Sequence, residues 1–413
     1  MRKKRKTRIL KRMCVWKMAL CIMCIAGLLS GCGKQSEQLA GEKDMEQDSY
    51  ESVQQFSYSL MTQNLQEKNP VLSPVSAYLA LAMAGNGADG ETAEEFGQVL
   101  GTDMTNVSCS LMKALPKKEE KTKLSISDSA WMDQELIPED DWLAVIKDVF
   151  HAEAYRAKLS SDEAMEQINA WVEQRTNGLI PGMLEEPLPQ EARLALFNTV
   201  YFYADWQTPF QAEATYEQEF YKEDGSTAMV DMMHRREEYE DYWQNERFEG
   251  IFLPYADETL AFVALKPTDG STVRELYAEL TPERLSQLLK EKQNGLVTLE
   301  LPKYEITFDK VLNEELKQMG LQQAFDGEKA DFTKLGRAER GGNLYISLVR
   351  QKAVIRVDEK GTEAAAATEL AMCEMTALRE TEPVHVCFDE PFVYMIWDTE
   401  TEVPVFIGIM DEP

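Results

Sequence analysis

Cysteine and histidine are scarce in this chain of 413 residues, which has seven Cys and three His. One C-x-x-C pair, Cys21 and Cys24, occurs near the N-terminus, but this spacing does not recur after residue 31. The three His residues are His151, His234 and His385. None of them has a partner residue at a recognisable catalytic or metal-binding spacing. The sequence also has no HExxH, no GxSxG and no P-loop motif. These absences argue against a disulfide framework, a zinc site and a catalytic centre, so we expect no metal, no cofactor and no enzymatic activity.

Basic residues are few relative to acidic ones. The chain has 43 Lys and Arg against 72 Asp and Glu, which gives a formal net charge of −29. Nine of the basic residues and none of the acidic ones lie in residues 1–31, so the remainder carries a formal charge of −38. Proteins bind nucleic acid largely by neutralising phosphates with basic groups, so we expect no nucleic-acid partner. We interpret the charge as a contribution to solubility, and we expect a monomer.

The first 31 residues combine a basic cluster with a short apolar run from Met18 to Gly31. The run is too short to span a bilayer comfortably as a helix, but it is typical of the core of a signal peptide. It ends in Leu29-Ser30-Gly31-Cys32, which resembles the lipobox of bacterial lipoproteins. The resemblance implies that residues 1–31 are removed and that Cys32 is lipidated with a diacylglycerol. The alternative is an unmodified signal peptide followed by a chance Cys.

This N-terminal pattern predicts export and a lipid anchor on the outer face of a bacterial cell membrane, or an extracellular protein if it is shed. Residues 33–48 are polar and lack an apolar period, so we interpret residues 32–48 as the lipidated Cys and a flexible tether. A single domain follows at 49–413. With Cys32 lipidated, an odd number of Cys remains: Cys109, Cys373 and Cys387.

The apolar spacing within 49–413 is mixed. Helical spacing dominates the first half, where Ser73-Pro74 is typical of an N-cap followed by the first helical residue. Runs typical of strands become more frequent toward the C-terminus. The predicted helices lie at 49–63, 74–85, 168–172 and 312–319, and the predicted strands at 195–203, 260–267, 297–306, 353–357 and 391–398. This order favours an α+β domain built on a large, mostly antiparallel sheet.

One literal G-x-G-x-x-G sequence occurs at Gly85, Gly87 and Gly90. A dinucleotide site needs a strand before this motif and a helix N-terminus facing the phosphates. Here a helical pattern precedes the motif, so we predict a turn between two helices.

The segment from Thr362 to Cys373 has two faces when it is read as a strand, because alternate side chains of a strand point to opposite sides. One face is uncharged: Thr362, Ala364, Ala366, Thr368, Leu370 and Met372. The other face carries both charges, Glu363 and Glu369. The alanine run has only a weak preference for strands, so this segment can become a strand without a strong tendency to do so. The alternative is an ordinary helix or flexible loop, since Ala favours helix.

Many ordered segments of the chain are similar to one family. They include Asn69-Pro-Val-Leu-Ser73-Pro74-Val-Ser76, Ile168 to Val172 with Thr176-Asn-Gly178, Asn198 to Phe202 with Trp206 and Pro209-Phe210, LPKYEI, LNEELKQMGLQQAF, Ala330-Asp331-Phe332, Val357 to Thr368, and Pro391-Phe392 with FIGIMDEP. In this order they resemble the serpins, a family of serine protease inhibitors, from about Ser49 to Pro413.

The resemblance implies the serpin fold, in which several helices surround a large central, mostly antiparallel sheet, with two smaller sheets and an exposed reactive-centre loop at about 359–382. It implies a loop hinge formed by Glu359, Gly361, Thr362, Ala364, Ala365, Ala366, Ala367 and Thr368. It also implies two polar regions of the central sheet, a shutter at its middle and a breach at its top, formed by Asn69, Ser73, Ser76, Asn198, Trp206, Ser347 and Gln351.

The mechanism implied by the resemblance is a suicide-substrate reaction. A serine endopeptidase, or alternatively a cysteine endopeptidase, attacks the loop and forms an acyl-enzyme. The cut loop then inserts into the central sheet as a new strand, which carries the protease away and distorts its active site before deacylation. The hinge fits this reaction because it carries no bulky or charged residue on the face that would be buried.

The scissile bond is placed by counting. From Glu359, the usual hinge length places it between Met375 and Thr376. Counting back from Pro391 instead places the bond near Glu380, because the loop or its return strand is several residues longer than in typical members. Leu378 and Arg379 are therefore alternative residues before the scissile bond. An apolar Met suits an elastase-, chymotrypsin- or subtilisin-like protease, whereas a trypsin-like enzyme would prefer Arg379.

A second departure from the family lies in the shutter. A His commonly precedes the hinge Glu by eight residues, and here that position is Gln351. A Gln side chain can still donate and accept hydrogen bonds, but we expect the threshold for opening the sheet to differ and pH sensitivity at this position to be lost. Two other functions compete with inhibition: a non-inhibitory serpin-fold binding or scaffold lipoprotein on the cell surface, and an unrelated surface enzyme or solute-binding lipoprotein.

Overall fold

The computed structural model describes residues 50–339, 342–362 and 382–413, which belong to one compact unit, Met45–Pro413. Cys32, the tether at 33–48 and most of the predicted loop lie outside the described residues. Residues 50–62 are helical. The other helices are α2 (Pro74–Gly85), α3 (Gly90–Leu100), α4 (Met104–Ala114), α5 (Asp140–Asp148), α6 (Asp162–Arg175), α7 (Val273–Glu279), α8 (Pro282–Lys290) and α9 (Asn313–Met319), with short 3-10 turns at Ala212–Ala214 and Gln323–Phe325.

The predicted helix start at Pro74 and the predicted turn after that helix agree with the structure. Helix α2 begins at Pro74 with Ser73 as its N-cap residue, although the Ser73 side chain makes no capping hydrogen bond. The G-x-G-x-x-G sequence is the turn between α2 and α3, since α2 ends at Gly85 and α3 begins at Gly90. A Cβ at Gly87 would lie 2.4 Å from the Cβ of Leu335, so the turn packs too closely for any other residue.

The central sheet has seven strands in the described part of the chain, in the order β12-β14-β15-β6-β3-β2, with β5 beside β3. The strands are β12 (Tyr304–Val311), β14 (Arg350–Val357), β15 (Gly361–Thr362), β6 (Leu194–Asp205), β3 (Thr122–Asp133), β2 (Lys117–Lys118) and β5 (Glu153–Ala157). All pairs are antiparallel except β3 with β5. This confirms the predicted α+β class and mostly antiparallel pairing.

A second sheet has nine strands, in the order β1-β18-β17-β10-β9-β8-β11-β16, with β7 beside β8. Its strands are β1 (Val71–Leu72), β18 (Val403–Met410), β17 (Phe392–Asp398), β10 (Leu260–Pro267), β9 (Phe248–Pro254), β8 (Thr227–Gln244), β11 (Gln293–Pro302), β16 (Val384–Cys387) and β7 (Thr215–Tyr221). Strand β8 is 18 residues long and pairs with β7, β9 and β11, which is why so many strands join one sheet. A two-stranded sheet pairs β4 (Leu136–Pro138) with β13 (Gly336–Ala338).

The predicted strand at 297–306 is wrong as a single element. The chain leaves the nine-stranded sheet at Pro302, the end of β11, and enters the central sheet at Tyr304, the start of β12. Local alternation continues across this point, so the sequence pattern does not reveal that the two halves belong to different sheets.

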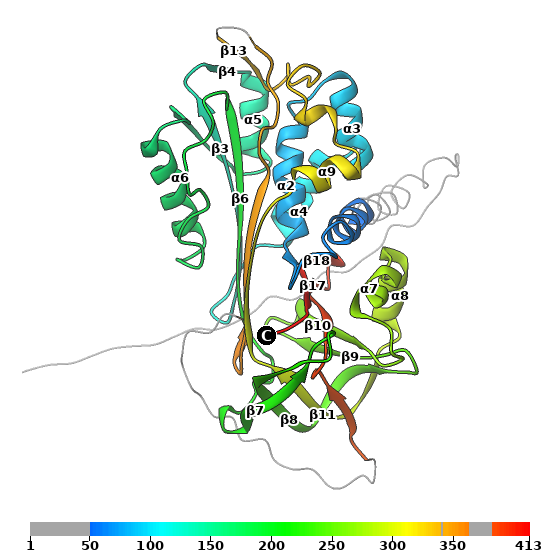
Figure 1. Ribbon diagram of the computed structural model, residues 1–413. Coiled ribbons are helices and arrows are strands. Elements are labelled where there is room, and N and C mark those ends of the chain that lie inside the picture. Colours follow the sequence, from blue (N-terminus) through cyan, green and yellow to red (C-terminus); the bar gives the residue numbers. More distant parts are fainter. Residues whose placement is uncertain (1–49, 340–341, 363–381) are drawn as a thin grey trace, which may run out of the picture. The chain divides into compact units, whose positions relative to one another are not determined.

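Strand β6 has apolar packing on both faces, which is why it lies at the centre of the fold. On one face, Phe202 and Ala204 belong to the main core, to which the buried helix α2 contributes. On the other face, Phe197 packs with Trp131 of β3 and with Ile168 of α6 in a separate cluster. Helices α2 and α6 therefore cover opposite faces of the central sheet (Figure 1).

Within the described residues, every helix is either too short or too polar to pass through a lipid bilayer.

Candidate functional site

The hinge begins with a tight reversal of the chain after β14. Thr362 of β15 pairs with Val357 of β14 on one side and with Ala204 of β6 on the other. The Asp358 carboxylate stabilises the reversal, because its Oδ1 accepts hydrogen bonds from the N–H of Lys360 (2.9 Å) and of Gly361 (3.3 Å). A Cβ at Gly361 would lie only 1.9 Å from the carbonyl oxygen of Ala204, so this position requires glycine.

Thr362 is buried and lies in a polar and aromatic network at the top of the central sheet. Its side chain is 2% exposed, and its hydroxyl shares a 2.6 Å hydrogen bond with the Tyr255 hydroxyl. The Tyr255 ring stacks on Trp206 with ring centroids 4.8 Å apart. Trp206 Nε1 donates to the Asp358 carbonyl (2.9 Å), and the Trp206 N–H donates to the Lys360 carbonyl (2.7 Å). The predicted breach residue Trp206 thus contacts the hinge directly.

Glu359 fixes the outer side of the same reversal. Its carboxylate forms a 3.0 Å ion pair with Lys303, and its carbonyl oxygen accepts a hydrogen bond from the Phe210 N–H (2.7 Å). Partial burial alone would raise the pKa of the Glu359 carboxyl, but its own backbone N–H and the Lys303 ammonium outweigh burial, so the pKa is lowered.

Below Thr362, strands β6 and β14 are linked only through β15 among the described strands. We call the interval between Leu194–Tyr203 of β6 and Arg350–Arg356 of β14 the interstrand gap. Just under Thr362, about 260 Å³ of empty space is bordered by Phe202 and Ile355. Farther down, a second opening of about 580 Å³ lies between α2, the start of β6 and the segment before β14. Its lining is largely apolar and includes Ala80, Leu81, Leu194, Leu196, Leu348 and Val349.

The shutter residues Ser73 and Gln351 bind each other. The buried Gln351 amide accepts a hydrogen bond from the Ser73 N–H (3.1 Å) and donates one to the Ser73 carbonyl (2.8 Å). Gln351 therefore attaches β14 to the start of α2 with both atoms of its amide.

Asn198 of β6 forms the opposite side of the shutter. Ser76 Oγ of α2 donates to Asn198 Oδ1, and Asn198 Nδ2 donates to Asp128 Oδ1 of β3 (2.7 Å). The second oxygen of Asp128 is buried and has no partner among the described residues. Burial raises the pKa of Asp128 from 3.8 to about 7, although the Asn198 hydrogen bond acts in the opposite direction.

Two predicted residues lie apart from this cluster. Asn69 has a left-handed backbone (φ 44°) and binds the C-terminal residues: its side chain accepts from the N–H groups of Asp411 (2.8 Å) and Glu412 (3.1 Å). The carbonyl oxygen of Ser347 accepts a hydrogen bond from the Asn313 side chain (2.9 Å). Neither residue forms a hydrogen bond to Ser73, Ser76, Asn198 or Gln351 among the described contacts, and the roles assigned to both stay predictions.

Several predicted residues lie outside the described residues and have no structural account here. They are Cys32, Ala364, Ala365, Ala366, Ala367, Thr368, Cys373, Met375, Thr376, Leu378 and Arg379. Conversely, sequence reasoning missed Tyr255, Lys303 and Asp128, and it did not assign a role to Asp358. Among the described residues, no group of three or more His, Cys, Asp or Glu side chains is arranged to hold a metal ion.

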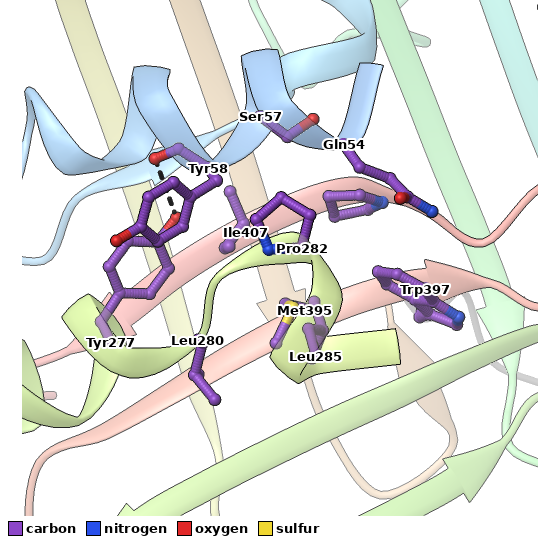
Figure 2. A pocket seen from close by; sticks show the side chains of 11 residues that line it. Gln54, Ser57, Tyr58, Tyr277, Leu280, Pro282, Leu285, Met395, Trp397 and Ile407 are labelled. Atoms are coloured by element: carbon purple, nitrogen blue, oxygen red, sulfur yellow. Dashed lines mark hydrogen bonds between the residues drawn. The ribbon is translucent and has the colours of Figure 1, made fainter. Parts of the chain in front are cut away.

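A separate pocket of about 360 Å³ lies between the helix at 50–62, α7–α8 and strands β17–β18 (Figure 2). Its wall is mostly apolar, and the Tyr58 and Tyr277 rings stack within it. Its polar side chains already bind protein groups: Gln54 donates to the Glu402 carbonyl and Ser57 to the Val53 carbonyl. None of the hinge residues lines it, so it is not part of the candidate site.

The comparisons with known proteins agree on one family. The serpin (serine protease inhibitor) family profile matches residues 51–413. A serpin-like protein of Thermococcus kodakarensis is 31% identical over 88% of this chain and 85% of its own length. Alpha-1-antiproteinase S of Cavia porcellus is 29% identical over 86% of this chain and 87% of its own length. The chain belongs to the serpin family.

Solved serpin structures show the same fold. The thermophilic serpin tengpin in its native state is 34% identical and covers 88% of this chain and 94% of its own, with a TM-score of 0.81. The latent state of tengpin gives a lower TM-score of 0.74. Serpins are protease inhibitors rather than catalytic enzymes, and the serpin homologues imply a protease partner in general.

Proposed function

We propose that this serpin inhibits serine endopeptidases as a suicide substrate. The observation that carries the proposal is the position of β15: Thr362 is already paired between β6 and β14, above an interstrand gap that contains no described strand. The unpaired backbone groups along this gap can accept one further antiparallel strand. The residues that follow Thr362 are the ones that can supply it.

The register of β15 predicts where each following residue would lie if the strand continued. Thr362 faces Ala204 and Val357. Each further step of two residues along the segment then corresponds to a step of two residues along β6 and along β14. Ala364 would lie between Phe202 and Ile355, and Ala366 between Val200 and Ala353. Thr368 would lie between Asn198 and Gln351, so its hydroxyl would enter the shutter. This parity is the uncharged face of the segment.

The lower opening fits the larger side chains of the same face. In this register Leu370 would lie opposite Leu196 and Val349, and Met372 opposite Leu194. All three facing residues line the 580 Å³ opening. Filling it with the Leu370 and Met372 side chains would bury apolar surface, which stabilises the protein by about 25 cal/mol for each Å² removed from water. It would also remove unfilled space from the core.

The outward face supports the register independently through charge. The same count places Glu363 opposite Arg356 and Glu369 opposite Arg350, both on β14. Opposite charges on directly facing residues stabilise a strand pair. The two arginines now bind Glu305 and Asp309, with nitrogen–oxygen distances of 2.6 and 2.7 Å, so the inserted strand would share existing ion pairs.

The reaction proposed for the loop at 359–382 begins with attack on the Met375 carbonyl carbon by the protease serine. An ester to the Met375 carbonyl forms, the Met375–Thr376 peptide bond breaks, and the new amine of Thr376 takes up the proton. The cut removes the covalent constraint on the loop, so residues 363–374 can enter the gap before water hydrolyses the ester. The uncut form is then a kinetically stable state. Met375 fits an elastase-, chymotrypsin- or subtilisin-like protease; Leu378 and Arg379 are the rival sites.

We also propose that the protein is exported and anchored through a lipid on Cys32, on the basis of the lipobox-like sequence before it. Replacing Cys32 with Ala should release the protein from membranes into the soluble fraction. Unchanged membrane association of Cys32→Ala, together with an unmodified N-terminus, would refute the anchor.

A protease panel tests the inhibitory function. A cysteine protease is included, since inhibition of that class is the alternative target. The expected result is a complex with an elastase-like enzyme that survives hot SDS, together with a C-terminal fragment that begins at Thr376 by mass spectrometry. Cleavage without a stable complex would instead show a substrate-like, non-inhibitory serpin. A fragment that begins at Glu380, with trypsin inhibited and elastase not, would move the scissile bond to Arg379.

A further inference from the structure

Strand β16, which follows the reactive-centre loop, lies at the edge of the nine-stranded sheet and pairs with one strand only among the described strands. Its residues pair in parallel with β11, from Val384 opposite Val297 to Cys387 opposite Glu300. Local opening is easiest where few backbone hydrogen bonds hold an element, so side-chain contacts decide how firmly β16 is held.

The Glu300 carboxylate of β11 is the centre of these contacts. From β16, His385 Nε2 lies 2.9 Å from Glu300 Oε1, and the Cys387 thiol donates to Oε2 (3.4 Å). From β7, Gln218 Nε2 also donates to Oε2 (2.8 Å). Partial burial alone would raise the pKa of Glu300, but these hydrogen bonds and the nearby His234 outweigh burial, so the pKa is lowered from its ordinary 4.5. The carboxylate therefore remains ionised at pH 5.5.

His234 of β8 faces the same carboxylate in an arrangement that suits a protonated ring. Its Nδ1 lies 3.0 Å from the carbonyl oxygens of Ala214 and Met232, which only accept, so Nδ1 carries a hydrogen. Its buried Nε2 has no hydrogen-bond partner among the described residues and lies 3.6 Å from Glu300 Oε2. In the neutral ring a lone pair points at the carboxylate, whereas protonation places an N–H there. The Tyr216 ring stacks on His234 with centroids 4.0 Å apart, which also favours a cation.

The other charged contacts of β16 involve Lys266 of β10. Lys266 forms ion pairs with Glu249 (3.1 Å) and Asp389 (2.8 Å), and Glu249 accepts a hydrogen bond from the Cys387 N–H (3.3 Å). Burial alone would lower the pKa of Lys266, but the two carboxylates outweigh burial and raise it, so the ammonium stays charged. Burial raises the pKa of the Cys387 thiol, which therefore remains a donor at pH 8. Histidine ordinarily titrates between pH 5 and 8, so the two imidazoles make this cluster respond to pH.

Release of β16 is a step that insertion of an uncut loop requires. In the register given above, residues 363–374 would extend β15 by twelve positions, or about 40 Å. The chain from 374 to 384 would have to return over this length, but its ten residue steps span at most about 36 Å. Strand β16 also lies beyond the top of the central sheet, because its partner β11 ends before Tyr304, which pairs with Val357 beside Thr362. A paired β16 therefore blocks insertion until the loop is cut.

We propose that Glu300, His234 and His385 form a pH-sensitive clasp that holds β16 to the sheet at mildly acidic pH and loosens above neutrality. The clasp depends only on the contacts described here, whereas its consequence, a longer-lived uncut form at acidic pH, rests on the proposed function. At pH 5.5 two protonated imidazoles face one ionised carboxylate. Toward pH 8 His385 keeps only a neutral hydrogen bond, and the His234 lone pair repels the carboxylate.

Hydrogen exchange of the β16 amides tests the clasp without any protease. Exchange at Val384–Cys387 is measured at pH 5.5 and 8.0 and divided by the intrinsic rate at each pH. The test variants are His234→Gln/His385→Gln and Glu300→Gln. The control is His151→Asn, which changes the remaining His at an exposed position with a left-handed backbone (φ 51°) that Asn tolerates.

We expect β16 of the wild type and of the control to be about tenfold better protected at pH 5.5 than at pH 8.0, and both test variants to lose most of this dependence. Asp128 titrates in the same range, so the effect is taken as the difference between wild type and variant, in which Asp128 cancels. If the double variant does not fold, His385→Gln alone should lose part of the dependence, since this side chain is 58% exposed. Equal protection at both pH values in the wild type, or an unchanged dependence in the variants, overturns the clasp.

The lifetime of the uncut protein tests the consequence. After incubation at each pH, the remaining capacity to form an SDS-stable complex with an elastase-like protease is measured. The wild type should lose this capacity about tenfold more slowly at pH 5.5 than at pH 8.0, and the double variant at similar rates. A pH-dependent β16 with a pH-independent lifetime would overturn the link to the uncut form. A pH-dependent β16 without any SDS-stable complex would refute inhibition alone.

Discussion

The top and the middle of the central sheet are both polar, but they differ in strand pairing. Both contain buried oxygens without a partner among the described residues, and at the top one of them is Thr122 Oγ1, in the residue that pairs with Ala204. At the top, Thr362 bonds to Tyr255 and Asp358 binds the reversal that precedes β15. In the middle, buried oxygens of Ser73, Asp128 and Thr199 have no partner among the described residues. The top is a completed strand pairing, whereas the middle is the part of the sheet that an additional strand would complete. An inserting strand would therefore extend β15 from the top downward, because only the top already has a strand between β6 and β14.

The largest effect is expected at the completed end. Thr362→Arg places a cation in a buried position without a partner, at a cost of several kcal/mol to any state in which residue 362 remains between β6 and β14. Insertion should slow, so deacylation should prevail and the stoichiometry of inhibition should rise. The matched control is Ala365→Arg, on the opposite parity, which should remain an inhibitor. Normal complex formation by Thr362→Arg would contradict the assignment of the hinge.

The cost of an unpartnered buried carboxylate in the middle of the sheet can be tested by changing Asp128. Its pKa is about 7 in the folded protein against an ordinary 3.8, so between about pH 4 and pH 7 the unfolded chain loses a proton that the folded protein keeps. Stability of the wild type should therefore fall as the pH rises through this window and stay low above it. Asp128→Asn removes the penalty and should be more stable at pH 8 by a few kcal/mol, with little difference at pH 4.

Thermal unfolding of both proteins at several pH values measures this difference, and other titrating groups cancel between them. A variant that is no more stable than wild type at pH 8 would show that the Asp128 carboxylate is compensated in a way this structure does not contain.

A smaller effect is expected from Tyr255→Phe at the top of the sheet. It removes one hydrogen bond and leaves the buried Thr362 hydroxyl without its partner, which should lower the free energy of unfolding by about 1–2 kcal/mol. The control is Tyr394→Phe, because the Tyr394 hydroxyl is buried and has no partner among the described residues. It should be neutral or slightly stabilising. Equal losses in the two variants would mean that the bond to Thr362 adds nothing beyond ring packing.

The smallest effect is expected from Lys303→Met, which breaks the ion pair to Glu359. The Lys303 side chain is 41% exposed, and partly exposed pairs contribute about 0–1 kcal/mol. The loss should shrink further as salt is added. Denaturant unfolding with and without added NaCl measures it, and a salt-independent loss of more than about 2 kcal/mol would show that the pair holds the hinge more firmly than its exposure suggests.

Local patterns in the sequence predicted several individual elements, because burial and strand alternation leave a direct trace in residue order. Strand β10 spans the predicted range 260–267. Strand β6 (Leu194–Asp205) is a few residues longer than the strand predicted at 195–203. The site contacts were harder to predict. Tyr255 meets Thr362 across 107 positions, and Asp128 meets Asn198 across 70. Such contacts depend on how the sheets pack, and a single Tyr or Asp in a strand pattern carries no sign of its partner. Of the residues named by the family resemblance, Ser76 contacts Asn198, Gln351 contacts Ser73 and Trp206 contacts the hinge, whereas Asn69 binds C-terminal residues; the roles assigned to them stay predictions.

The order of strands in the nine-stranded sheet has a consequence for the cut protein. Strands β17 and β18 follow the reactive-centre loop in sequence, yet they lie inside the sheet, between β10 and β1. A cut anywhere in residues 363–381 therefore divides the chain into two pieces that stay associated through core strands. Once such a nicked molecule is unfolded, reassembly requires the two fragments to meet in solution, so refolding becomes second-order and fails on dilution. Intact and cut forms can thus be told apart by whether recovery after denaturation depends on protein concentration.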